Sequence, residues 1–155
     1  MAYTSSSTRL KRLIVNYRLN YASSSFTILW HTALIYAANA ILEHTEDKGW
    51  YSYLLLCLYG YRDLSRSWRV AKAISKGLLS MALRQGDLSG ATARRLFRDL
   101  DTRNPDEVSE NIRATFMLDL ELAPNEPELA TVERLAADFE GNAMMMDYTT
   151  IMEEN

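Results

Sequence analysis

Few side chains of this sequence have the types and the spacing that enzyme chemistry requires. The two histidines, His31 and His44, are 13 residues apart, and no serine-elbow or cysteine–histidine signature accompanies them. Cys57 is the only cysteine and lies in the apolar run LLLCLYGY, where a buried, inert thiol is expected. One cysteine can build neither a disulfide framework nor a cysteine metal cluster. Nucleophilic catalysis and thiolate metal sites are therefore not expected.

Acid–base chemistry has equally little support. The carboxylate pairs Asp99 with Asp101 and Asp119 with Glu121 are two residues apart, a spacing at which side chains do not face each other on a helix. The sequence contains no GxxxxGKS/T or GxGxxG loop that could cradle phosphates. We expect this chain not to be an enzyme and to hold no cofactor and no metal.

Basic residues that could contact phosphate are distributed over much of the chain. They are Arg9, Lys11, Arg12, Arg18, Arg66, Arg69, Arg94, Arg95 and Arg98. The isoelectric point of the chain is nonetheless about 5.4, and no recognition-helix motif stands out. We expect no direct sequence-specific nucleic-acid binding by this chain alone.

Charge is divided unevenly along the chain. Residues 1–103 contain 15 Lys and Arg against 7 Asp and Glu, a net charge of +8, whereas residues 104–155 contain 2 against 13, a net charge of −11. Such a division suggests that the two halves attract each other or that the acidic part meets a separate partner. A solvated acidic face would explain it as well.

An apolar surface for a partner or a small molecule is expected around one helix. Its candidate residues are Trp50, Tyr53, Leu55, Leu56, Tyr59, Tyr61 and Trp68. The aromatic residues fit the core and its rim, or the walls of a pocket between helices. Leu55, Leu56 and Tyr59 lie away from the main apolar stripe of this helix, which indicates a central or partner-covered helix. Self-association or a helical partner is expected through the helices 26–42 and 50–61.

Apolar periodicity predicts about five helices. The first carries apolar residues from Phe26 to Ile41 after a cap among Ser23–Ser25, and the others cover about 50–61, 67–85, 90–103 and 127–141. Ser89 is the expected N-cap of the fourth helix, and Asn125–Glu128 resembles a capping box for the fifth. Gly86 and Gly141 are expected to end helices.

The expected fold is all-α, an irregular helical bundle with one extended arm. The arm is Ala114–Ala123, where Phe116 and Leu118 begin an apolar alternation of period two. The expected organisation is a polar, basic segment over 1–23, a helical domain over 24–142 and an acidic-apolar tail over 143–155. No stretch resembles a membrane span or a secretory signal, so the nucleus or the cytoplasm is expected.

Three segments together resemble the C-terminal helical region of fungal zinc binuclear cluster transcription factors, especially regulators similar to the nitrate-assimilation activators. The segments are WHTALIYAANAILE, WYSYLLLCLYGYRDLSRSWRVAKAISKGLLSMALRQGDLSGATARRLF and ATFMLDLELA with the following LATVERLAADFE. The resemblance covers about residues 26–142 and is most specific over Arg69–Gly90. It implies a nuclear, all-helical regulatory segment that tunes activation downstream of a DNA-binding domain.

The sequence departs from that family at the DNA-binding element. The six-cysteine cluster and its dimerising linker are absent, and Cys57 alone cannot replace thiolates at close spacing. The chain is thus similar to a C-terminal fragment or a shortened paralogue.

Two functions are compatible with these features. The first is a regulatory and protein-interaction module of a fungal transcription factor, whose partners are coregulators, its own upstream domains or a second copy. The alternative is a helical sensor that binds a small-molecule effector between the second and third expected helices.

Overall fold

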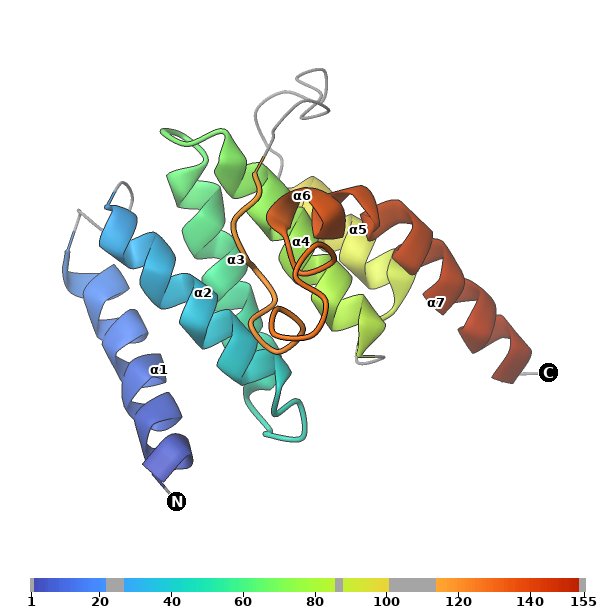
Figure 1. Ribbon diagram of the computed structural model, residues 1–155. Helices are drawn as coiled ribbons and strands as arrows, with labels where there is room; N and C mark the ends of the chain where they lie inside the picture. Colours follow the sequence, from blue (N-terminus) through green and yellow to red (C-terminus); the bar gives the residue numbers. More distant parts are fainter. Residues whose placement is uncertain (1, 22–26, 86–87, 101–113, 154–155) are drawn as a thin grey trace. The chain divides into compact units, whose positions relative to one another are not determined.

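The computed structural model describes residues 2–21, 27–85, 88–100 and 114–153 and shows an all-α protein (Figure 1). Within these residues there are seven helices and no strand. They are α1 (Ala2–Asn20), α2 (Ile28–Leu42), α3 (Trp50–Leu64), α4 (Val70–Arg84), α5 (Gly90–Leu100), α6 (Val132–Ala137) and α7 (Phe139–Glu153). The predicted all-α class is confirmed. The helix count differs because α1 was not expected and the last helix is divided in two.

The chain forms two compact units, Met1–Trp68 and Arg69–Asn155. The first contains α1, α2 and α3, and the second contains α4 to α7. The boundaries expected after residues 23 and 142 lie inside these units. The two helices that the small-molecule sensor would use, α3 and α4, belong to different units.

In the first unit, α1 forms where a polar, basic segment was expected. Its Ile14 is buried, and its Arg18 donates from Nη1 to the carbonyl of Leu56 at 3.0 Å and from Nη2 to Asp63 at 2.9 Å. Lys11 lies over the ring of Tyr53 at 5.3 Å from its centroid. Tertiary contacts with α3 therefore stabilise a helix that apolar periodicity did not reveal.

Helices α2 and α3 pack closely at Gly60. A β-carbon at Gly60 would lie 2.8 Å from Cδ1 of Leu34, so the missing side chain allows the two backbones to approach. The predicted stripe of α2 is correct for Trp30 and Leu34, which are buried, but wrong for Leu29, which is 75% exposed. Phe26 and the expected cap Ser23–Ser25 lie outside the described residues. The N-cap of α2 is Thr27, whose side chain accepts no capping hydrogen bond.

Helix α4 is the central helix of the second unit, and its residues from Ala73 to Leu83 are buried except for Lys76. The segment 114–118 lies against this helix, and a β-carbon at Gly77 would lie 2.5 Å from Cδ2 of Leu118. Backbone hydrogen bonds join 114–118 to 130–133, with Leu118 N–H donating to the carbonyl of Ala130 at 2.8 Å. This segment is the first half of the predicted arm.

The second half of the arm is not extended. Leu120–Asn125 forms turns, and the period-two alternation fails because Phe116 is exposed whereas Asp119 is buried. Asp119 is buried because its carboxylate forms an ion pair with Arg84 and accepts the N–H of Leu122 at 2.9 Å. A polar residue thus occupies an inward position that the apolar pattern had assigned to the surface.

Helix ends in the second unit confirm one predicted cap and contradict another. Ser89 caps α5, since its Oγ accepts the N–H of Thr92 at 3.2 Å. The expected capping box at Asn125–Glu128 does not start a helix. Helix α6 begins after Thr131 instead, whose side chain accepts the N–H of Arg134. Gly86 and 101–103 lie outside the described residues, and Gly141 lies within α7 rather than ending a helix.

Candidate protein-interaction surface

The seven residues of the expected apolar surface do not form one exposed face. Tyr61 is completely buried, and its hydroxyl donates to the carbonyl of His31 at 3.2 Å, so it belongs to the core. The other six are half-buried: Trp50, Tyr53, Leu55, Leu56, Tyr59 and Trp68. The helical repeat of 3.6 residues places Leu55 and Tyr59 on one side of α3, and Trp50 and Tyr61 on the other.

Aromatic residues of this set contact neighbours within the first unit. The ring of Trp68 lies 5.7 Å from that of His31, and the guanidinium of Arg62 lies 4.7 Å from the ring of Tyr59. Among the side chains of α2 that the structure describes, the exposed large apolar ones are Leu29 and Tyr36, seven residues apart on its outer side. Association through α2 and α3 remains a prediction.

The residues considered above for catalysis or metal binding differ in their surroundings in the fold. Burial lowers the pKa of His31, which favours the neutral imidazole. Burial raises the pKa of Cys57 to about 12, so its thiol stays protonated at neutral pH. Asp99 and Glu121 are exposed, and Asp101 lies outside the described residues. In the described part of the chain, no group of three or more His, Cys, Asp and Glu residues could hold a metal ion.

The most exposed apolar surface of the second unit lies on α7. We define the outer face of α7 as Gly141, Met144, Met145, Tyr148 and Met152. Its side chains are 53% exposed at Met144, 70% at Met145, 67% at Tyr148 and 80% at Met152. Steps of three and four residues place all five on one side of the helix.

The opposite side of α7 packs into the second unit. Phe139 and Ala143 are buried there, and the ring of Phe139 lies 5.6 Å from that of Phe97 on α5. The amide of Asn142 donates to the hydroxyl of Ser80 on α4 at 3.0 Å. Helix α7 is therefore apolar on two sides, and the side with Phe139 and Ala143 packs against α4 and α5.

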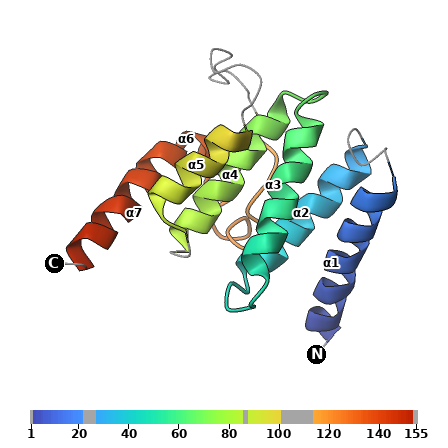
Figure 2. The ribbon, with the colours of Figure 1, turned by 180° about the vertical axis from the view of Figure 1, so that it is seen from behind.

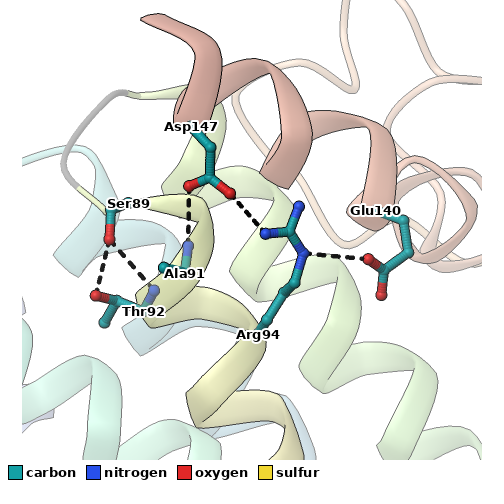
Figure 3. Close-up of polar contacts among 6 residues, drawn as sticks. All are labelled: Ser89, Ala91, Thr92, Arg94, Glu140 and Asp147. Carbon is teal, nitrogen blue, oxygen red and sulfur yellow. Dashed lines mark hydrogen bonds and ion pairs between the residues drawn. The ribbon is translucent and has the colours of Figure 1, made fainter. Parts of the chain in front are cut away.

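A polar clasp fixes α7 on α5, and Figure 3 shows its residues. The carboxylate of Asp147 accepts from Arg94 Nη1 at 2.6 Å and from the backbone N–H of Ala91 at 3.0 Å. Arg94 Nε also lies 3.5 Å from Glu140, which precedes Asp147 by seven residues on α7. We call Arg94, Asp147 and Glu140 the α5–α7 clasp.

The clasp has a clear electrostatic basis. The hydrogen bond from Arg94, together with the backbone N–H groups of Ala91 and Gly90, holds the pKa of Asp147 below its usual value of 3.8. A carboxylate at the N-terminus of α5 also interacts favourably with the helix dipole. Gly90 contributes by its small size, because a β-carbon there would overlap the carbonyl oxygen of Ala143. Figure 2 shows α5 and α7 side by side in the view from behind.

Sequence reasoning missed this surface. The methionines and Tyr148 were assigned to a tail because Gly141 was expected to end the preceding helix. The signal that could have revealed the surface is the spacing of Met144, Tyr148 and Met152, which is that of one helix face.

Comparisons with protein-family models, curated proteins and solved structures found no match for this chain. Among the residues that the structure describes, no helix is both long and apolar enough to span a membrane.

Proposed function

We propose that this chain is a protein-interaction module of a fungal transcription factor. In this proposal it acts in the nucleus, modulates transcriptional activation and receives a protein partner on the outer face of α7. The observation that carries the proposal is this face, where four large apolar side chains are more than half exposed on a helix that the clasp fixes to its unit. Contiguous exposed apolar surface of this kind favours association.

The resemblance to the fungal regulators is most specific in the same unit, which supports a functional role for that unit. Its most specific block, Arg69–Gly90, contains α4 and extends to the first residue of α5. Helix α4 packs against α7, and Asp147 accepts hydrogen bonds from the backbone N–H groups of Gly90 and Ala91 at the start of α5. Part of the segment that carries the resemblance thus packs against the helix of the proposed binding surface.

Charge favours a protein over a nucleic acid as the partner of α7. Residues 139–155 contain four acidic residues, Glu140, Asp147, Glu153 and Glu154, and no Lys or Arg. A segment of this charge repels phosphate backbones, whose binding depends on Lys and Arg. Exposed methionines, by contrast, adapt their shape to apolar partner surfaces.

A reporter assay tests this function. The 155-residue chain is fused to an unrelated DNA-binding domain, and transcription is compared for the wild type, Tyr148→Asp and Leu129→Asp at equal protein levels. Leu129 is an exposed apolar residue of the same unit outside the outer face, so it is the matched control. We expect the fusion to change transcription and Tyr148→Asp alone to remove the change. No effect of the wild-type fusion, or equal effects of all three proteins, would contradict the proposal.

A further inference from the structure

Gly141 has no explanation within the described part of the chain. A β-carbon on Gly141 would meet nothing within 4 Å, and its backbone does not have the positive φ that requires glycine. Glycine inside a helix lowers stability relative to alanine, because it loses more conformational freedom on folding. A close approach of a second molecule to the outer face of α7 would give this glycine a role.

The pattern of the outer face indicates that the approaching surface is itself a helix. Gly141 and Tyr148 occupy one heptad position, Met144 a second, and Met145 and Met152 a third. Three apolar positions in seven are typical of a helix that faces other helices. The four large side chains expose on the order of 500 Å² together, which is near the upper range for the largest apolar patch of a monomer.

We propose that the occupant is α7 of a second copy of this chain, packed antiparallel about a two-fold axis. This inference rests on the proposed function, because it names the partner of the same surface. In an antiparallel helix pair, residues face each other when their numbers have a constant sum. One axis, between residues 146 and 147, places Gly141 opposite Met152 of the second copy and Met145 opposite Tyr148 of the second copy.

Both pairings are complementary in shape. The space at Gly141 receives the long side chain of Met152, and the sulfur of Met145 contacts the ring of Tyr148, a favourable contact. The same register repeats on the other side of the axis, as a two-fold interface requires. A parallel pair would place Gly141 opposite Gly141 and leave a gap there.

The contact area of this dimer is small. Two such faces bury about 1,000 Å² in total, which is the lower limit for a specific protein interface. The dimer is therefore weak and reversible, and it forms as the concentration of the chain rises.

Sedimentation velocity at several concentrations tests the dimer with the full chain. We expect the wild type and Leu129→Asp to shift from monomer to dimer, and Tyr148→Asp to weaken the dimer by about tenfold or more, since it places a charge within an apolar contact. Gly141→Leu is the sharper variant. It should raise the melting temperature of the monomer yet weaken the dimer, because its side chain has open space only in the isolated chain.

Cysteine cross-linking tests the register. A chain with Met145→Cys mixed with a chain carrying Tyr148→Cys should form a mixed disulfide dimer under mild oxidation. The native Cys57 is buried and should not interfere. Efficient cross-linking of Tyr148→Cys with itself would indicate a parallel pair and overturn the proposed register.

The outcomes separate this inference from the proposed function. A wild-type chain that stays monomeric at every concentration, or a dimer that Tyr148→Asp and Gly141→Leu leave unchanged, overturns the second copy as the partner. If Tyr148→Asp still removes reporter activity in that case, the proposed function stands with another protein as the partner. If the wild type forms the dimer but its fusion has no effect on the reporter, this inference stands and the proposed function is contradicted.

Discussion

The guanidinium of Arg94 on α5 holds the carboxylate of Asp147 on α7 at 2.6 Å, across 53 residues of sequence. The other oxygen of the same carboxylate accepts the N–H of Ala91, so one side chain binds both a cation and the start of α5. This contact fixes which side of α7 packs against the rest of the second unit. The outer face with Tyr148 consequently points away from it.

Asp147 should make the stability of the second unit depend on pH in the acidic range. Its pKa is lowered in the folded state, chiefly by the hydrogen bond from Arg94, so its stabilising contribution is present above its unfolded pKa and is lost as pH falls through the lower folded value. We expect Asp147→Asn to melt at a lower temperature than the wild type at neutral pH. The difference should disappear at a pH well below 3.8. Melting curves over this range check it, and an equal difference at all pH values would rule out the ionised clasp as the cause.

Two glycines should respond to alanine in opposite directions. At Gly90 the new β-carbon would overlap the backbone carbonyl of Ala143, which cannot move without shifting α7. We expect Gly90→Ala to destabilise the chain by about 3 kcal/mol, the upper part of the range for overpacking. At Gly141 the space is open, and alanine should stabilise the chain by about 0.5–1 kcal/mol. Urea unfolding measures both, and a Gly90→Ala variant as stable as the wild type would show that α5 and α7 do not approach as closely as described.

Replacement of buried leucines on α3 by alanine should lower the stability of the chain. Leu54 and Leu58 are completely buried, and their replacement by alanine should each cost about 2–5 kcal/mol. Leu29, which is 75% exposed on α2, is the control, and its replacement should change the free energy of unfolding by less than about 0.5 kcal/mol. Denaturant unfolding of the three variants decides this. If Leu58→Ala matches Leu29→Ala, α3 is not a core helix.

Cys57 should be unreactive while the chain is folded. It is buried, and its pKa of about 12 leaves almost no thiolate at neutral pH. We expect a thiol reagent to modify the native chain only as fast as the chain unfolds, and to modify the denatured chain at once. A chromogenic thiol reagent measures this, through the rate at which its coloured product is released in buffer and in guanidinium. Rapid modification of the native chain would show that α3 is accessible.

The all-α class and four of the helices, α2 to α5, could be predicted from the sequence. Apolar residues at steps of three and four residues bury one side of a helix, as they do at Leu54 and Leu58, and the serine before α5 satisfies a backbone N–H at its start. These signals are local. They depend on residues within a few positions of one another, so neighbouring sequence is sufficient to read them.

The tertiary structure alone decided α1, the burial of Asp119 and the continuation of α7 through Gly141. Arg18 stabilises α1 through partners on α3, Arg84 allows Asp119 to be buried, and the clasp keeps α7 on the second unit so that a helix continues through Gly141. Each outcome depends on a residue more than 30 positions away. Periodicity and capping signals cannot report such contacts, because the free energy that settles them arises only when distant segments are packed together.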